Sequence, residues 1–355
     1  MISVTMRPDG PHPPAAPLRL ALDHAALAGN WRTLDRMSGS AAAGAAVKAD
    51  GYGVGVRRVV PELVAAGCRD FFVAHWQEAD EIADLVPSGS IAVLHGPLDD
   101  ADVAWARSTG VRPVINSLPQ AARWLAGGGG PCDLMLDTGI NRLGLPLAEL
   151  GDPLIGRLEI AVLMSHLASA EEDSPLNERQ RLRWEAARRV LPHRRASLAN
   201  SAGIALGPAY HSDLTRPGLA LYGGVPCAAL APLIRPVITP QAALLQTRTI
   251  AAGESVGYNA TFTAARPMQV GVIALGYADG YLRCWSDVGT VRAGGHELAV
   301  LGRVSMDMTV IDLSSAPDLR EGDWVDVVYD LPAAATASGL SQYELLTLLG
   351  KRFSR

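Results

Sequence analysis

The feature that most constrains the fold is a regular alternation of short apolar runs with longer amphipathic stretches between about residues 18 and 218. The short runs predict buried strands, and the stretches between them carry the periodicity of helices. Strands separated by helices are typical of a parallel sheet. We expect strands at Ala45–Ala49, Phe71–His75, Ile91–His95, Val111–Ile115, Asp133–Asp137, Ile160–Ser165, Ala196–Ala199 and Leu214–Arg216.

Helical patterns fill the intervals between these strands. They are Val56–Ala66, Glu78–Val86, Val103–Ser108, Pro119–Leu125 and Glu178–Val190. Eight strands that alternate with helices over roughly 200 residues predict a (β/α)8 TIM-type barrel. A doubly wound open sheet would also alternate, but it normally carries a glycine-rich dinucleotide loop after an early strand, and this sequence has none. The only low-complexity patch, Gly127–Gly130, is interpreted as a flexible loop.

The residue pattern of the sequence changes beyond about Pro236, where short β-rich segments alternate with turns that contain Gly, Pro and Asp. We expect strands at Ala242–Thr249, Met268–Leu275, Glu297–Leu301, Thr309–Leu313 and Trp324–Tyr329, and one short helix at Gln342–Leu349. The predicted division is an N-terminal extension at 1–17, the barrel at 18–235 and a mainly β C-terminal domain at 236–355.

Composition excludes several classes of protein. The 355 residues are 48% hydrophobic and 19% charged, which is ordinary for a globular chain with a large core. A formal net charge of −5 argues against nucleic acid and anionic membranes as partners. We expect no membrane span, because the longest apolar stretch is broken by Gly and Pro. The four cysteines stand alone at 68, 132, 227 and 284, and the proline-rich N-terminus does not resemble a signal peptide, which favours the cytoplasm.

Lysine is scarce in this chain, and its scarcity singles out one residue. Only Lys48 and Lys351 are lysines among the 31 basic residues, so arginine is the default where positive charge alone is needed. Lys351 lies near the C-terminus and is expected to face water. Lys48 ends the first barrel strand, where partial desolvation would lower its pKa and allow it to form a Schiff base. The alternative is a strand-end lysine paired with an acid.

Other strand ends supply further polar groups. His166 and Arg216 follow their strands directly, while Ser201 and Gly218 with Leu219 lie where barrels bind phosphate. Taken singly, each residue has an ordinary structural explanation: Ser201 could be no more than a helix cap, and His166 could be a histidine of the core. Together, a lysine that can form a Schiff base, a phosphate cradle and arginines suit pyridoxal 5′-phosphate (PLP).

The segment Ala46–Gly55, with the sequence AVKADGYGVG, resembles the PLP attachment signature of bacterial alanine racemases. Seven further matches follow in the order of that family. They are Leu136–Gly144, Ser165–His166, Ala199–Ala202, Arg216–Gly223, Val256–Phe262, Leu275–Gly280 and Gly302–Asp307. Matches in this order across both predicted domains make the resemblance specific.

The resemblance implies a fold-type III PLP enzyme that works as a head-to-tail homodimer, each site being completed by the partner's C-terminal domain. It implies that Lys48 holds PLP and acts as one base, while Tyr258 from the partner chain acts as the other. The phosphate would be bound by Tyr52, Ser201, Gly218, Leu219 and Tyr343.

The same resemblance assigns the remaining site residues. Arg216 would face the pyridine nitrogen, and His166 would link Arg216 to Tyr258. Arg142 and the backbone of the partner's Met306 would hold the substrate carboxylate. Tyr277 would line the substrate entrance, and no metal is expected.

The sequence departs from the common family pattern at Met135, where many members carry a lysine that becomes carbamylated and orients the arginine. Methionine cannot form that carbamate, so Arg142 must be supported otherwise. The function implied is interconversion of L-alanine and D-alanine, supplying D-alanine for peptidoglycan in the cytoplasm. The alternatives are a PLP racemase of other or broader specificity, such as serine, and a non-catalytic PLP-binding barrel protein.

Overall fold

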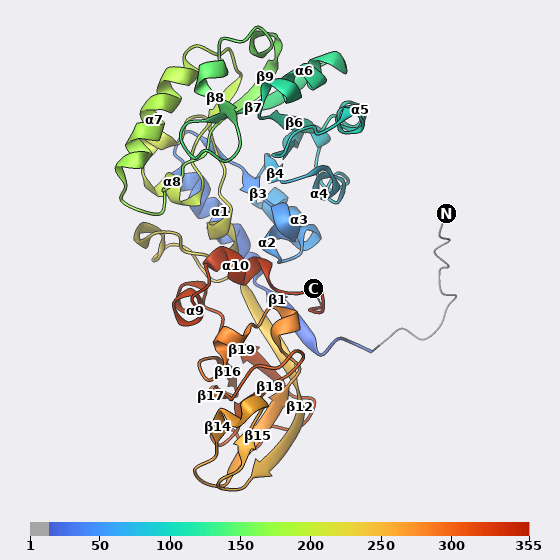
Figure 1. Ribbon diagram of the computed structural model, residues 1–355, viewed down its shortest axis with the longest axis vertical. Helices are drawn as coiled ribbons and strands as arrows, with labels where there is room; N and C mark the ends of the chain where they lie inside the picture. The colour runs from blue at the N-terminus through green and yellow to red at the C-terminus, as the bar shows by residue number, and fades with distance from the viewer. Residues whose placement is uncertain (1–13, 355) are drawn as a thin grey trace, which may run out of the picture. The chain divides into compact units, whose positions relative to one another are not determined.

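The computed structural model describes residues 14–354, so the first 13 residues of the expected N-terminal extension lie outside the described part. Two compact units are formed. The barrel unit comprises Leu22–Thr239 together with Tyr329–Leu348. The β unit comprises Pro240–Val328 and the described segments up to Ala21 and from Leu349 onward. Figure 1 labels the elements of both units.

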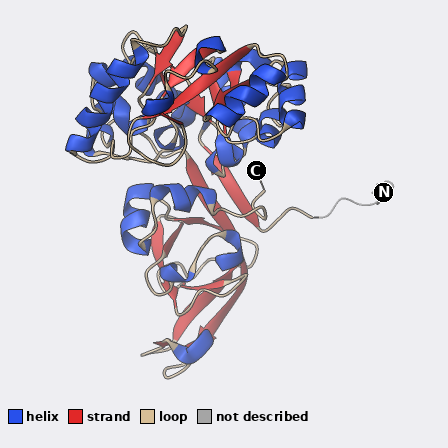
Figure 2. Ribbon diagram, turned by 45° about the horizontal axis from the view of Figure 1, so that its top comes forward, coloured by secondary structure: helices blue, strands red, loops and turns tan. Residues whose placement is uncertain are grey.

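Parallel strands form the centre of the barrel unit, and Figure 2 shows helices around them. The first strand is interrupted at Gly44, and the last strand closes the ring against it. Ala42 N donates to Asp213 O at 3.1 Å, and Ala46 N donates to Pro217 O at 2.9 Å. The strands are β2 (Ala42–Ala43), β3 (Ala45–Ala46), β4 (Phe71–Val73), β5 (Ile91–Val93), β6 (Arg112–Ile115), β7 (Pro131–Asp137), β9 (Glu159–Met164), β10 (Arg195–Ser197) and β11 (Leu214–Thr215).

Most helices of the barrel unit begin at a side chain that accepts a backbone hydrogen bond, as Asp23 does for Ala26 N at 2.8 Å and Asp99 for Asp102 N at 2.9 Å; α2, α3 and α4 have no such cap. They are α1 (His24–Met37), α2 (Lys48–Tyr52), α3 (Val56–Ala66), α4 (Trp76–Asp80), α5 (Asp100–Thr109), α6 (Leu118–Ala126), α7 (Pro175–Arg188), α8 (Ser201–Ala205), α9 (Leu331–Ser338) and α10 (Gln342–Thr347).

The barrel predicted from the sequence is confirmed, but several of its strands end earlier than expected, whereas β6 and β7 end at Ile115 and Asp137 as predicted. The first strand stops at Ala46, because Val47 leaves the extended conformation, and β4 stops at Val73. The helix α7 begins at Pro175 rather than Glu178, since Ser174 caps it by accepting from Leu176 N. The sequence interpretation missed α1 altogether.

Two helices from the end of the chain group with the barrel unit, whereas the sequence pattern assigns them to the β domain. The contact is specific: Val225 N donates to Gln342 Oε1 at 2.7 Å, and Gln342 Nε2 donates to Val225 O at 2.9 Å. Tyr329 Oη, at the start of this segment, donates to Leu345 O at 2.7 Å. Contacts of this kind cannot be read from composition.

The β unit is built on a seven-stranded sheet in the order β1-β12-β15-β18-β17-β16-β19, and β12 also pairs with β19. Neighbours from β12 through β19 run antiparallel. These strands are β1 (Leu18–Leu22), β12 (Ile238–Ile250), β15 (Met268–Ile273), β16 (Thr290–Ala293), β17 (His296–Leu301), β18 (Thr309–Asp312) and β19 (Trp324–Val327). The mainly β C-terminal domain is therefore confirmed as a fold.

Residues 14–354 contain no helix that combines the length and the apolar character required to cross a bilayer.

We expect Gly53→Ala to destabilise the barrel unit far more than Gly39→Ala. Both glycines have positive φ, +79° and +68°, so alanine is strained by about 1–2 kcal/mol at either position. Only at Gly53 would the new Cβ meet a backbone atom, Leu346 O at 2.4 Å, whereas Gly39 faces open space. Overpacking should add about 1–3 kcal/mol or more. Thermal unfolding of both variants measures the difference, and equal losses would contradict this account of α10.

Candidate active site

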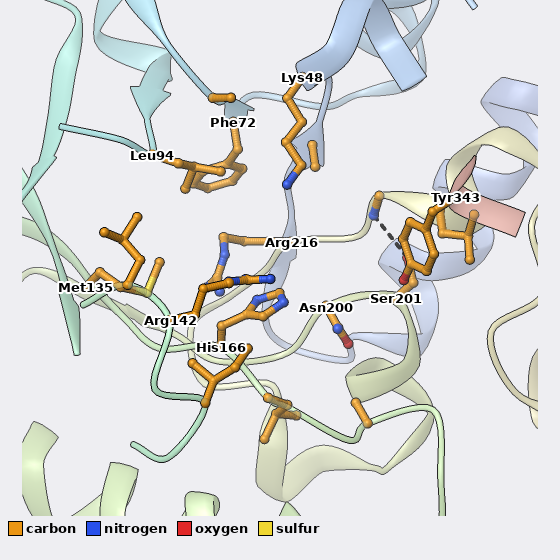
Figure 3. Close-up of a pocket in the computed structure, with 18 of the residues that line it drawn as sticks. Lys48, Phe72, Leu94, Met135, Arg142, His166, Asn200, Ser201, Arg216 and Tyr343 are labelled. Carbon is orange, nitrogen blue, oxygen red and sulfur yellow. Dashed lines mark hydrogen bonds between the residues drawn. The ribbon is translucent and has the colours of Figure 1, made fainter. Parts of the chain in front are cut away.

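A cavity of about 1050 Å³ opens at the carboxyl ends of the barrel strands, and it is lined by residues of the barrel unit alone (Figure 3). Nine of the residues singled out from the sequence line it. They are Lys48, Tyr52, Arg142, His166, Ser201, Arg216, Gly218, Leu219 and Tyr343. In Figure 3 the Lys48 amine points toward Arg216, and Arg142 lies beside His166.

A left-handed turn delivers the lysine to this cavity. Residues 49 to 53 all have positive φ, between 53° and 79°. Only two of these five residues are glycine, so the turn is strained at Ala49, Asp50 and Tyr52. The Asp50 carboxylate stabilises its exit by accepting from Val56 N at 2.7 Å.

Glu78 on α4 fixes the entry to the same turn. Its Oε1 accepts from Ala49 N at 2.6 Å, and its Oε2 accepts from Ala74 N at 2.7 Å. One carboxylate therefore joins the ends of two neighbouring strands. Hydrogen bonds to an ionised acceptor are stronger than neutral ones, which suits a position where the backbone is strained.

The environment of Lys48 favours the neutral amine. Burial lowers the pKa of its ammonium group, the positive charges of Arg142 and Arg216 lower it further, and Glu78 opposes them. A lysine with a lowered pKa can act as a nucleophile and as a base near neutral pH. The lysine expected from the sequence to be partly desolvated therefore lies in such a place.

Arg216 lies at the bottom of the cavity and is held by neutral groups. Its Nη2 donates to Ser165 O at 2.5 Å, and its Nη1 donates to the Ser197 hydroxyl. Burial lowers the pKa of Arg216 to about 10, so the group keeps its charge at neutral pH. Its guanidinium also lies 5.9 Å from the centre of the Phe72 ring.

His166 is uncharged in this site. Burial, followed by the charges of Arg216, Arg142 and Lys48, lowers its pKa to about 3. The resemblance implies that His166 links Arg216 to Tyr258, and with so low a pKa the imidazole at this position is neutral. The His166 carbonyl accepts from Gln180 Nε2 at 3.0 Å, which ties this strand end to α7.

The loop before Arg142 is shaped by one carboxylate. Asp137 Oδ1 accepts from the backbone N–H groups of Gly139 at 2.8 Å, Ile140 at 3.0 Å and Asn141 at 3.2 Å. Met135 lies beside Arg142 in Figure 3 as an apolar part of the wall. The direction of the arginine therefore follows from the folded loop rather than from an anionic side chain at position 135.

A second group of residues converges at the other side of the cavity. Ser201 Oγ accepts from Gly218 N at 3.0 Å and from Ala220 N at 3.3 Å (Figure 3). A Cβ on Gly218 would lie 2.3 Å from Tyr52 Oη, so only glycine admits the tyrosine here. Tyr52 in turn stacks on Tyr222 at 4.7 Å. Backbone donors, a hydroxyl and a phenol thus surround one small volume.

Tyr343 reaches the same volume from α10, and its hydroxyl donates to Glu171 Oε1 at 2.7 Å. Burial raises the pKa of Tyr343, and the Glu171 carboxylate raises it further. Donation from this hydroxyl to a phosphate would therefore require it to leave Glu171.

Three of the residues implied by the resemblance belong to the β unit. Tyr258 is 64% exposed and Met306 is 53% exposed. Tyr277 lies against the Met306 loop: Tyr277 N donates to Ser305 O and Ala278 N donates to Met306 O, both at 3.0 Å. The structure thus brings Tyr277 and Met306 together on one unit, separate from the residues that line the cavity.

Sequence reasoning missed Glu78 and Glu171. Glu78 was predicted only as the first residue of a helix, Glu78–Val86, and nothing in that pattern indicates its contact with Ala74 N. Glu171 lies 172 residues from its tyrosine partner, and nothing in the sequence joins them.

Fold and site together define a barrel enzyme with a lysine of lowered pKa, an anion cradle and two arginines at one cavity. Family models for the N-terminal and C-terminal domains of alanine racemase match residues 22–226 and 237–355. The chain belongs to the alanine racemase family.

Several relatives cover nearly the whole chain. An alanine racemase of Acidiphilium cryptum is 43% identical over 95% of this chain and 97% of its own length. Two from Agrobacterium fabrum, named biosynthetic and catabolic, are 38% and 40% identical over 96% and 95% of this chain and 93% and 91% of their own.

Solved structures agree with this family. The alanine racemase of Bartonella henselae with covalently bound pyridoxal phosphate has a TM-score of 0.87 at 35% identity, covering 96% of this chain and 99% of its own. The biosynthetic enzyme of Pseudomonas aeruginosa has a TM-score of 0.85 at 36% identity, with the same coverage.

We expect His166 to make stability depend on pH. Its pKa is about 3 in the folded chain and about 6.5 when unfolded. Between these values the unfolded chain binds more protons, so stability is lost as pH falls below about 6.5. The variant His166→Asn should lose less stability than the parent protein as pH falls below about 6.5. His296→Asn, at an exposed position of β17, is the control. Thermal unfolding across pH measures it, and identical slopes in both variants would contradict the buried, neutral assignment.

Proposed function

We propose that this protein interconverts L-alanine and D-alanine by a PLP-dependent, two-base mechanism. The observation that carries the proposal is the Lys48 amine, whose pKa is lowered in a cavity shared with Arg142 and Arg216. Membership of the alanine racemase family supports the substrate, and the Bartonella henselae structure with covalently bound pyridoxal phosphate supports the cofactor.

The residues of the cavity fit PLP by charge and by shape. The hydrogen bonds given for the buried Arg216 go to neutral groups, so a negatively charged ligand would balance its charge. The close approach of Tyr52 to Gly218 leaves backbone N–H groups beside the Ser201 hydroxyl. We assign the phosphate to Tyr52, Ser201, Gly218, Leu219 and Tyr343, the covalent attachment to Lys48 and the pyridine nitrogen to Arg216.

When bound, PLP supplies a conjugated system that takes up the electron pair left at the amino acid Cα when its proton is removed. The remaining work falls to the chain. Arg142 holds the substrate carboxylate with two parallel hydrogen bonds, which fixes the direction of the Cα–H bond. The neutral His166 packs beside Arg142 and adds no charge that would compete for the carboxylate.

Racemisation requires a proton to leave one face of Cα and another to arrive at the opposite face. Lys48 serves one face, since burial and the neighbouring arginines lower the pKa of its ammonium group and so favour the neutral amine that accepts a proton. We assign the other face to Tyr258 of a second copy of the chain, where its hydroxyl gives or takes the proton. Met306 would add its backbone to the carboxylate site, and Tyr277 would line the entrance.

The protein is therefore proposed to act as a head-to-tail homodimer. The support is that Lys48 lies in the cavity of the barrel unit, whereas Tyr258 and Met306 stand exposed on the β unit. Tyrosine and methionine are enriched at protein–protein interfaces relative to the rest of the surface. We further propose a barrel at 18–235 and a β domain at 236–355 as the division along the sequence, within which residues 329–348 group with the barrel.

We place the enzyme in the cytoplasm, where it would supply D-alanine for peptidoglycan. The four cysteines support this because each is unpaired in the structure. Chirality-resolved assay of L-alanine, L-serine and L-arginine tests the substrate. A higher kcat/KM for another amino acid than for alanine would replace the proposed specificity.

We expect activity to be restored by mixing two inactive chains, Lys48→Ala and Tyr258→Phe. In a mixed dimer one of the two sites keeps both bases, whereas the other lacks both. Activity after subunit exchange, with each variant alone as the control, measures this. If exchange is demonstrated and no activity returns, the shared site is wrong while the barrel assignment stands.

We also expect each base to serve one enantiomer. By resemblance to the family, Tyr258 serves L-alanine and Lys48 serves D-alanine. In deuterated water, Tyr258→Phe should keep isotope exchange into D-alanine and lose it for L-alanine. Lys48→Ala with added amine should show the reverse, and racemisation in both should fall by ~10²–10⁴-fold or more. Mass analysis of the separated enantiomers measures uptake, and symmetric residual exchange would mean a single base.

A further inference from the structure

A second cavity, of about 500 Å³, lies at the opposite end of the barrel strands from the candidate active site. Its wall includes Arg112, the first residue of β6, and Pro131, the first residue of β7. Arg194, which directly precedes β10, and Arg107 from α5 also line it. Three guanidinium groups therefore share one hollow that none of the proposed catalytic residues touches.

Arg112 is the best-buried of these groups, with a side chain that is only 10% exposed. Its Nε donates to Asp133 Oδ1 at 3.1 Å, and the same oxygen accepts from Val162 N at 3.0 Å. Its Nη2 is buried and has no hydrogen-bond partner among the described residues. Asp133 Oδ2 in the same ion pair is also buried and unpaired, so the pair is incompletely satisfied and Arg112 keeps hydrogen-bonding capacity at the wall of the cavity.

Arg107 is positioned by the glycine patch that the sequence interpretation treated as a flexible loop. Gly128, Gly129 and Gly130 have φ of +104°, +61° and +119°, which other residues rarely adopt. This path turns the Gly129 carbonyl toward Arg107 Nη1, and a Cβ on Gly128 would lie 3.0 Å from the guanidinium carbon. The glycine loop therefore holds the Arg107 side chain in place, and it carries no negative charge that would neutralise the guanidinium group.

Trp124 completes the same wall. It lies on α6, which neighbours α5 on the outside of the barrel (Figure 1), and its Nε1 donates to Gly130 O at 3.2 Å. The glycine loop is thus held at two successive carbonyls, one by Trp124 and one by Arg107. A loop held in this way presents a formed cavity rather than a flexible edge.

We propose that this cavity binds a small organic anion through carboxylate or phosphate groups. Guanidinium groups match both anions by paired, charge-assisted hydrogen bonds. Arg194 pairs with Glu159 and Arg112 pairs with Asp133. Arg107, which has no ion pair among the described residues, therefore supplies the uncompensated charge, and Arg112 adds hydrogen-bond donors to the wall. A volume of about 500 Å³ exceeds a single phosphate and falls in the range of small-molecule pockets.

The test uses holoenzyme whose cofactor has been fixed on Lys48 by borohydride, so that the active-site phosphate position is filled. Isothermal titration calorimetry with citrate and with glycerol 3-phosphate measures binding of a carboxylate and of a phosphate probe. We expect saturable binding of at least one probe, with one site per chain. Binding of citrate alone assigns the site to carboxylates, and binding of glycerol 3-phosphate alone assigns it to phosphates.

The change Arg107→Gln should weaken this binding about tenfold or more, because it removes a charged hydrogen-bond donor. Arg57→Gln is the matched control, since it removes an exposed arginine paired with Asp84 on the same unit. The double change Arg112→Gln with Asp133→Asn should also weaken binding without leaving a buried carboxylate unpaired.

Two results would overturn the proposal. One is no saturable binding of either probe to the parent protein. The other is binding that Arg107→Gln leaves unchanged, because the probe would then occupy another site, such as Arg142. Neither result bears on racemisation, so failure here is distinguishable from failure of the proposed function.

Discussion

The left-handed turn that follows the first barrel strand is the constraint on which the site depends. Ala49, Asp50 and Tyr52 each adopt a backbone conformation that costs about 1–2 kcal/mol for a residue with a side chain. The Glu78 carboxylate offsets this by accepting two backbone hydrogen bonds, one from the turn and one from the next strand. Without that turn, a regular strand or helix would carry Lys48 and Tyr52 in other directions.

Much of the site was predictable because the functional residues of a (β/α)8 barrel lie at the carboxyl ends of its strands. Lys48, Ser201 and Arg216 follow apolar runs in the sequence, and their recurrence at successive strand ends indicates one shared mouth. The scarcity of lysine made Lys48 stand out. These inferences need only the order of the predicted strands along the sequence. The structure brings the three residues together around one cavity.

What the sequence did not reveal are contacts made across space. Glu78 reads as a polar residue of a helix, yet its two oxygens join neighbouring strand ends. The glycine run from 127 to 130 reads as flexible, yet Trp124 and Arg107 hold its carbonyls. Tyr343 and Gln342 read as part of a β domain, because their neighbours in sequence are β-rich. In each case the deciding interaction links residues whose local pattern is uninformative.

The position of α10 has a consequence for how the protein is made. The barrel strands are encoded before residue 216, but the helix that supplies Tyr343 to the cavity is translated more than a hundred residues later. The barrel can close its ring of strands on the ribosome while one wall of its main cavity is still absent. A growing chain therefore exposes its lysine before it can enclose a ligand, and competence to retain one arises only near the completion of synthesis.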